Sequence, residues 1–211
     1  MSVWLQLLGW TGALAAAILL LLWAVAFDLW RIPTDDPLLA ASIQPTLSAG
    51  DLLLVTRRTT PSRGDLLRCA DPQAPGRFVI GRAMAQAGDH LVLQGGVVIV
   101  DGHHAPSPHA CDEPKISVFD PNRNDDVELD CAVEASGEMT YSVLRSRDAT
   151  EPATKLTIER NKWFLVSDNR SVHLDSRDFG EIGADGCQHI VFRLAGPAGL
   201  SDARSRFTVI W

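Results

Sequence analysis

The chain has 211 residues, and its 26 acidic side chains outnumber its 19 basic ones to give a net charge of -7. An acidic surface repels a phosphate backbone, which argues against nucleic acid as a partner. Apart from one long apolar segment, the length fits a single domain with a core large enough to fold alone.

The chain begins with that apolar segment. From Val3 to Phe27, 25 positions, no residue is charged, and this exceeds the roughly 20 residues that a helix needs to cross a membrane. Trp4 and Trp30 lie 26 positions apart, or roughly 39 Å along a helix, close to the separation of the two headgroup zones that tryptophan prefers. The sequence therefore predicts one N-terminal transmembrane helix, with residues 1–30 as a single-pass anchor in membrane lipid.

A cleavable secretory signal is the alternative for this segment, since Ala24-Val25-Ala26 has the small-x-small form of a cleavage site. The first six residues contain no Lys or Arg, and the apolar run is about twice as long as a normal signal core. These two features favour the anchor.

The rest of the chain has the pattern of a β protein. After a linker at 32–37, apolar and β-branched runs of four to seven residues are bounded by Gly, Pro or Asp. Strands are expected at 51–56, 65–68, 78–83, 90–93, 97–100, 155–158, 163–166, 188–194 and 207–210. Helical periodicity is hard to find outside the anchor, so the sequence predicts an all-β domain formed by residues 31–102 and 155–211.

Residues 103–154 form a predicted acidic insertion. They contain eleven acids and four bases, and the difference, 11 − 4 = 7, equals the whole net charge. The run from Asp120 to Asp125 resembles the opening of a calcium loop, but Asp125 stands where the loop needs glycine and Cys131 where it needs a bidentate glutamate. The histidines of the insertion lack zinc spacing. We therefore predict no metal site and no cofactor.

The four cysteines permit three disulfide pairings. Cys111 and Cys131 both lie in the insertion and would close a moderate loop in an oxidising compartment, which makes this pair the favoured one. A bond between Cys69 and Cys187 is possible, but nothing in the sequence supports it.

A candidate nucleophile lies in the stretch LLAASIQPTLSAGDLLLV, residues 38–55. Pro45-Thr46, followed by Ser-Ala-Gly-Asp, fixes a turn and a second bend, so the segment before Pro45 is expected to be extended. Ser42 then lies at the mouth of a turn. A serine in such a place is usually only a turn residue, so its role depends on the other motifs of the chain.

Three motifs occur in order across most of residues 38–183. The first is the run of six residues from Ser42 to Leu47. The second is an Arg-containing strand with Gly88-Asp89 and Asp101-Gly102, and the third combines Asp168-Asn169-Arg170 with Asp175-Ser176-Arg177. Together they resemble the three boxes of type I signal peptidases. The resemblance implies the mixed β-sheets of that fold and, as substrate, a precursor protein that bears a signal peptide.

Type I signal peptidases cut with a serine nucleophile and a lysine general base, and the lysine immediately precedes the arginine of the second box. Here that arginine is Arg82 and the preceding residue is Gly81, which can do no acid or base work. The chain has three lysines, Lys115, Lys155 and Lys162, and none of them stands at the family's position.

A histidine in the third box is the candidate replacement base. The family pattern has a serine two residues before Asp175, and this chain has His173 there. We expect the imidazole to fill the volume vacated at Gly81 and to reach Ser42, with Asp175 or Asp168 on its other ring nitrogen. Ser42, His173 and Asp175 are therefore the candidate catalytic residues.

The other motif residues are expected to shape the site. The family has a serine two residues before the nucleophile whose hydroxyl helps to bind the oxyanion, but this chain has Ala40, so only the backbone N–H of Ser42 would remain. The resemblance places Gly81 and Arg82 in the structural part of the site. It also implies an internal set of ion pairs among Asp168, Arg170, Asp175 and Arg177.

Two functions from different classes stay open. One is a membrane-anchored, signal-peptidase-like serine endopeptidase that cleaves exported precursors after small residues, which the presence of Ser42 favours. The other is a non-catalytic relative that acts as a binding or assembly factor for exported subunits, which Gly81 and Ala40 favour. The resemblance places the β domain on the external or periplasmic side of the inner (plasma) membrane, although Arg31 alone would weakly favour the cytoplasm.

Overall fold

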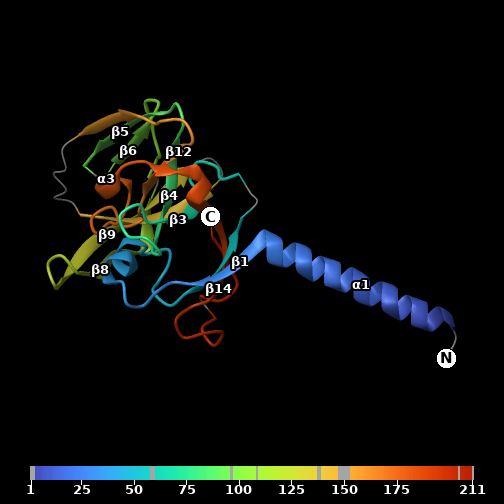
Figure 1. Cartoon of the computed structure of the whole chain (residues 1–211). Helices are drawn as coiled ribbons and strands as arrows, with labels where there is room; N and C mark the ends of the chain where they lie inside the picture. The colour runs from blue at the N-terminus through green and yellow to red at the C-terminus, as the bar shows by residue number, and fades with distance from the viewer. Residues whose placement is uncertain are drawn as a thin grey trace.

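A computed structural model describes residues 3–57, 60–95, 97–107, 109–136, 139–146, 153–203 and 205–210, with the backbone alone at 3–9, 19 and 22. Helix α1, Val3–Ala26, projects away from a body built mostly of antiparallel strands (Figure 1). The elements of the body are β1 Phe27–Arg31, α2 Pro37–Ser42, β2 Leu52–Thr56, β3 Leu66–Ala70, β4 Phe78–Gln86, β5 His90–Gln94, β6 Val97–Val100, β7 His103–His104, β8 His109–Asp120, β9 Asp125–Ser136, β10 Met139–Arg145, β11 Thr154–Thr157, β12 Lys162–Val166, α3 Ser176–Phe179, β13 Ile182–Gly183, the 3-10 turn Ala184–Gly186, β14 Cys187–Ala195 and β15 Thr208–Val209. The sequence predicts an all-β domain, and the body is mostly β but also contains the short helices α2 and α3.

Among the described residues, the strands form three sheets. The largest has eight strands in the order β1-β2-β14-β3-β4-β12-β13, with β15 paired to β14. A four-stranded sheet has the order β11-β5-β6-β7, and a three-stranded sheet has the order β10-β9-β8. The three-stranded sheet lies within the predicted insertion, so we call it the insertion sheet.

Strand β1 begins at the residue that follows helix α1. Each of its residues has a partner on β2, and Trp30 packs edge-on against Phe78 with ring centroids 5.6 Å apart. Residues 27–30, which the sequence assigns to the anchor, therefore lie in the main sheet. They do so because cross-strand pairing and the Trp30 contact hold them there.

Helix α1 carries exposed apolar side chains that include Trp10, Leu14 and Trp23. Within the described part of the chain, no helix is found to be both long enough and apolar enough to cross a membrane. The transmembrane anchor thus stays a prediction, and the side chain of Trp4, on which part of it depends, lies outside the described residues.

The insertion sheet contains strands that the sequence analysis did not expect. Along β9, Leu129 and Cys131 are buried while Glu128 is exposed, so apolar and acidic residues alternate across the sheet. Because the segment contains so many acids, this alternation is hard to recognise in the sequence, and the segment resembles a solvated loop. A disulfide joins Cys111 on β8 to Cys131 on β9, and another joins Cys69 to its register partner Cys187.

Helix α2 lies between two apolar layers. Leu39 and Ile43 pack into a core cluster with Leu53 of the main sheet. Ala41 packs into a different cluster with residues of the insertion sheet, including Leu144. The helix is therefore held from both sides, which determines where its last residue, Ser42, lies.

Candidate active site

Helix α2 ends on the candidate nucleophile. Asp36 caps the first turn by accepting a hydrogen bond from the N–H of Leu39 at 3.0 Å, and Pro37 occupies the first helical position, where no N–H is needed. The extended segment expected before Pro45 is wrong, because this Asp-Pro start signal begins a short helix that runs to Ser42.

Ser42 is closed off from solvent, and its hydroxyl is already bonded. Its exposed fraction is 0%, and its Oγ donates a hydrogen bond to the carbonyl oxygen of Leu39 at 2.9 Å. A hydroxyl has one proton to donate, so Ser42 cannot at the same time donate to His173. The third box packs directly over the helix end, since Asn169 donates from its N–H to Ser42 O and from its side chain to Ala41 O, both at 3.1 Å.

The expected oxyanion donor is also occupied. Ser42 is the sixth and last residue of α2, so its N–H belongs to the hydrogen bonds inside the helix and not to the free N–H groups of the first turn. Ala40 has no hydroxyl to add. This conformation therefore offers no oxyanion site at Ser42.

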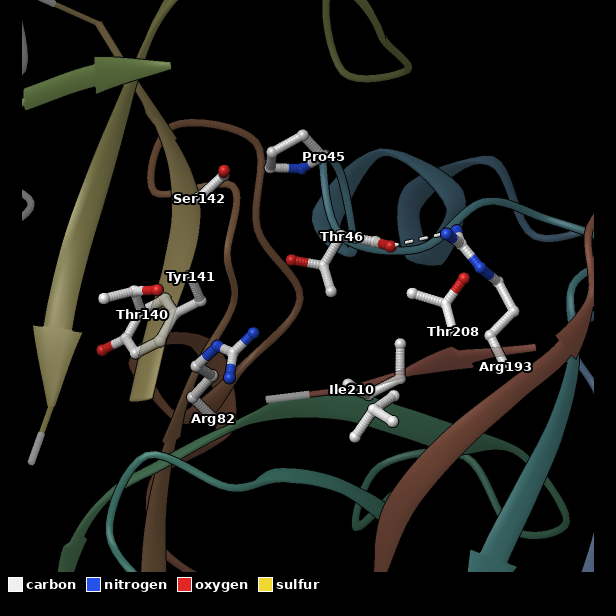
Figure 2. Close-up of a pocket in the computed structure, with 10 residues that line it drawn as sticks. Pro45, Thr46, Arg82, Thr140, Tyr141, Ser142, Arg193, Thr208 and Ile210 are labelled. Atoms are coloured by element: carbon white, nitrogen blue, oxygen red, sulfur yellow. Dashed lines mark hydrogen bonds between the residues drawn. The ribbon is translucent and has the colours of Figure 1, made fainter. Parts of the chain in front are cut away.

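A pocket of about 230 Å³ opens just beyond the Ser42 turn (Figure 2). Pro45, Thr46, Arg82, Tyr141 and Arg193 are among the residues that line it, and Ser42 is not one of them. Threonine and arginine side chains thus line this pocket, and the candidate nucleophile does not.

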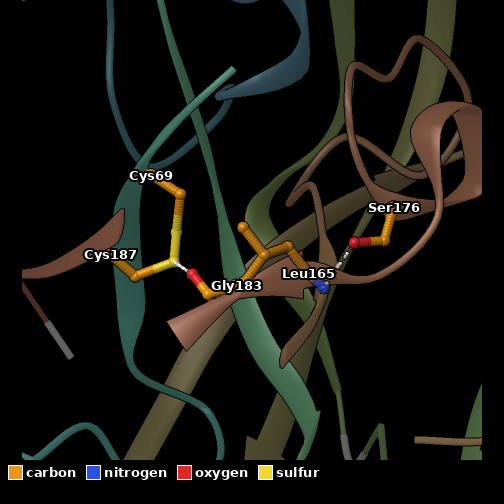
Figure 3. The surroundings of a disulfide bond; sticks show 5 residues. All are labelled: Cys69, Leu165, Ser176, Gly183 and Cys187. Atoms are coloured by element: carbon orange, nitrogen blue, oxygen red, sulfur yellow. Dashed lines mark hydrogen bonds between the residues drawn. A yellow bond between two sulfur atoms is a disulfide. The ribbon is translucent and has the colours of Figure 1, made fainter. Parts of the chain in front are cut away.

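Gly81 leaves no vacancy for a histidine. A Cβ atom built on Gly81 would lie 3.1 Å from the Cβ of Leu165 on β12 and 3.4 Å from backbone atoms of Val166. Strand β12 is held in this place by a hydrogen bond from the N–H of Leu165 to Ser176 Oγ at 2.9 Å (Figure 3). The expectation that His173 fills the volume beside Gly81 is wrong, because β12 closes against the glycine backbone.

His173 lies in a different environment from Ser42. Its Nδ1 is 2.8 Å from Asp178 Oδ2, and its ring lines a second pocket, of about 520 Å³, together with Leu93, Leu156 and Phe164. Burial and the Arg177 charge lower the pKa of His173, but the hydrogen bond to Asp178 and the charges of Asp175 and Asp178 together raise it on balance. The carboxylate hydrogen-bonded to Nδ1 is therefore Asp178, where the sequence predicted Asp175 or Asp168.

Asp175 binds groups of the third box on both sides of it in the chain. It is buried, and its carboxylate accepts hydrogen bonds from the N–H of Ser167 at 2.7 Å and from the guanidinium of Arg177 at 2.8 and 3.0 Å. It also caps α3 by accepting from the N–H of Arg177. Burial would raise the pKa of Asp175, but the Arg177 charge and its hydrogen bonds hold that pKa well below the usual range.

Arg82 and Asp168 form a buried ion pair beneath the first box. The Nε and Nη2 atoms of Arg82 lie 2.8 and 3.1 Å from the two carboxylate oxygens of Asp168, and the guanidinium lies 3.8 Å from the ring centroid of Tyr141. Thr46 donates its hydroxyl proton to the same carboxylate. This pair joins the second and third boxes to the turn after Ser42.

Arg170 pairs outside the expected set. Its Nη2 lies 2.7 Å from Glu134 on β9, and Arg145 on β10 lies 2.8 Å from the other oxygen of Glu134. Of the predicted set, Arg177 does pair with Asp175, while Asp168 pairs with Arg82. The third box is thus bound to the insertion sheet by an acid that the sequence analysis did not single out.

The side chains of His173, Asp175 and Asp178 gather their ligand atoms within 4.8 Å of one another. Both oxygens of Asp175 already accept N–H donors, and the Arg177 charge lies against them. This arrangement is unfavourable for a cation, and we assign no metal to it.

Asp178 could have been predicted from the sequence, whereas Glu134 could not. Asp178 has a local signal, because Asp175 and Asp178 have the spacing of a capping box, and both of its hydrogen bonds are present. Glu134 has none, because it is one acid among many on an acidic strand, and only the packing of β9 on the third box distinguishes it.

The sequence model of the family described as signal peptidase, peptidase S26, matches residues 5–190 of the chain. No curated protein matches the chain significantly. The family consists of peptidases, generally of the serine type, which are typically membrane-associated and act on exported precursor proteins. The match covers most of the chain and all three boxes, so this protein belongs to the signal peptidase family, peptidase S26.

Proposed function

We propose that this chain is a membrane-anchored, signal-peptidase-like protein that binds exported precursors and does not cleave them. The proposal rests on one observation: neither the position of the nucleophile nor that of the base is open to a substrate. Gly81 packs against β12 where the family has its lysine, and Ser42 is fully buried with its hydroxyl bonded to Leu39 O. Without a base and an accessible hydroxyl, acyl transfer has no nucleophile.

The location outside the cytoplasm is supported by the two disulfides, Cys69–Cys187 and Cys111–Cys131, since such bonds persist in oxidising compartments. The anchor is supported by the uncharged run of residues 3–27 and the exposed apolar side chains of α1. Full-length protein should stay with the membrane pellet after an alkaline carbonate wash, and its release into the supernatant would contradict the anchor.

The test of function mixes purified full-length protein in detergent with a radiolabelled precursor that has small residues at the first and third positions before the cut. We expect the precursor to co-purify with the protein and to keep its full length on a gel. A Ser42→Ala variant should bind the precursor as well as the wild type does. Cleavage by the wild type that is lost in Ser42→Ala would overturn the proposal.

The catalytic alternative keeps Ser42 as nucleophile with His173 as base and Asp175 in support. It is favoured by the contact between the third box and the nucleophile segment, where Asn169 binds both Ser42 and Ala41. It requires Ser42 Oγ to leave Leu39 O and the His173 imidazole to come within hydrogen-bond reach of the serine hydroxyl. In the same assay, loss of cleavage in both Ser42→Ala and His173→Ser would establish this alternative, while His104→Gln, at an exposed histidine, serves as the control.

A further inference from the structure

The pocket beyond the Ser42 turn has the chemistry of an anion site. Two guanidinium groups, Arg82 and Arg193, line it, and hydroxyls of Thr46, Ser142 and Thr208 are on its walls (Figure 2). Among the described residues that line it there is no acid. Arg82 is neutralised by its two-point contact with Asp168, so Arg193 is the cation to consider.

Arg193 is poorly satisfied by its own protein. Its Nη1 has two long contacts, 3.3 Å to Thr46 O and 3.5 Å to Asp51 Oδ2, and its Nε is buried without a hydrogen-bond partner. One oxygen of Asp51 is likewise buried and unpartnered, so the two groups match badly as a pair. A guanidinium presents five N–H donors in a planar fork, and a carboxylate satisfies two of them at once.

The walls around Arg193 select a compact ligand. Thr208 is the register partner of Arg193 on the neighbouring strand, so its side chain emerges beside the guanidinium on the same face of the sheet. Pro45, Val209 and Ile210 add apolar surface. A volume of about 230 Å³ accepts a carboxylate with one or two small residues and no more. Arg193, Thr208, Val209 and Ile210 all lie beyond the residues that match the family, so the family does not account for them.

We propose that this pocket binds the free C-terminal carboxylate of an exported peptide that ends in small residues, with the Arg193 guanidinium as its charged partner and Thr208 as an additional donor. The identity of the occupant as a peptide rests on the proposed function. The carboxylate chemistry rests on the pocket itself.

The test measures fluorescence polarisation of a fluorescein-labelled hexapeptide ending in Ala-Ala, in free-acid and C-terminally amidated forms, with full-length protein in detergent. The acid should bind at least tenfold more tightly than the amide. Arg193→Gln should remove that difference, and Thr208→Val should weaken acid binding a few-fold. Arg206→Gln, at an exposed arginine of the same segment, should change nothing.

If wild-type protein bound the acid and the amide equally well, or bound neither, the proposal would be overturned without any variant. Displacement of the acid peptide by equimolar acetate or inorganic phosphate would show that the pocket takes a free anion, and would overturn the peptide assignment. If the precursor of the previous section still binds while both hexapeptides fail, this site is wrong and the proposed function stands. If the precursor fails to bind while the acid peptide binds, the reverse holds.

Discussion

Gly81 allows strand β12 to approach β4 more closely than a residue with a side chain would. Val79 and Ala83, on the same face of β4, belong to one buried cluster with Leu165 of β12. Leu165 fills the space in front of Gly81. Gly81 therefore has a packing role, and a longer side chain at this position would displace β12.

We expect Gly81→Ala to destabilise the protein by about 1–2 kcal/mol, because the added methyl group would overpack against Leu165. Gly183→Ala is the matched control, since a Cβ there meets nothing within 4 Å, and it should change the stability by less than about 0.5 kcal/mol. Urea unfolding of both variants provides the measurement. A neutral effect of Gly81→Ala would mean that there is space for a methyl group between Gly81 and Leu165, which contradicts the structure.

The pair of His173 and Asp178 makes stability depend on pH. Although burial lowers the pKa of His173, the hydrogen bond to Asp178 and the charges of Asp175 and Asp178 together raise it above the ordinary value of 6.5. A histidine whose pKa is raised by folding contributes stability that is fully present below the unfolded pKa. That contribution is lost as the pH rises through the folded pKa.

The stability difference between wild type and His173→Gln should therefore be larger at about pH 5.5 than at about pH 8.5, by about 1 kcal/mol or less for a partly exposed pair. Thermal unfolding at the two pH values measures it. His104→Gln, at an exposed histidine, should show no such change between the two values. An equal effect of His173→Gln at both would mean that the ring is not charged in the folded protein at low pH.

At the scale of elements, the insertion sheet is clamped onto the third box. The N–H of Leu144 donates to Asp168 O at 2.9 Å, and the N–H of Arg170 donates to Leu144 O at 2.7 Å. Strand β10 is therefore paired with the third box through backbone hydrogen bonds. Glu134 adds charge to the same junction by holding Arg170 and Arg145 together. The segment that covers Ser42 is thus joined to the insertion sheet by both hydrogen bonds and ion pairs.

Glu134→Gln should cost about 3–5 kcal/mol of stability, because it leaves the buried Arg170 without its carboxylate. Glu128→Gln is the same substitution on the same strand at an exposed pair with Lys115, and should cost less than about 1 kcal/mol. Chemical unfolding distinguishes the two. A similar small cost for both variants would show that the Glu134 junction does not stabilise the fold.

At the scale of the whole molecule, two disulfides close loops of very different length. Cys69–Cys187 spans 118 positions and links the neighbouring strands β3 and β14 of the main sheet, whereas Cys111–Cys131 spans 20 positions within the insertion sheet. The longer loop restricts the unfolded chain more strongly. The main-sheet bond should therefore contribute more to stability.

Replacing Cys69 and Cys187 together by Ala should lower the free energy of unfolding by about 1.5 kcal/mol more than replacing Cys111 and Cys131, from loop entropy alone. Each pair has one fully buried and one partly buried cysteine, so the lost side-chain burial is similar. The midpoints of thermal unfolding should follow the same order. The opposite order would mean that the insertion sheet depends on its disulfide for folding.

Sequence alone determined the features that depend on local order. The family boxes, the mainly β character of the body and the absence of a lysine before Arg82 can all be seen in the chain, because motifs and period-two runs are properties of neighbouring residues. The start of α2 could also have been predicted, since Asp36-Pro37 is a local capping signal.

Only the tertiary structure decided what those residues do. The sequence offers Ser42 and His173 as candidate nucleophile and base, but the Ser42 hydroxyl bonds to its own helix and His173 bonds to Asp178. The space at Gly81 belongs to Leu165, from a strand more than 80 residues further along the chain. Burial, hydrogen-bond competition and close packing act between residues that are distant in sequence, so no local pattern contains them.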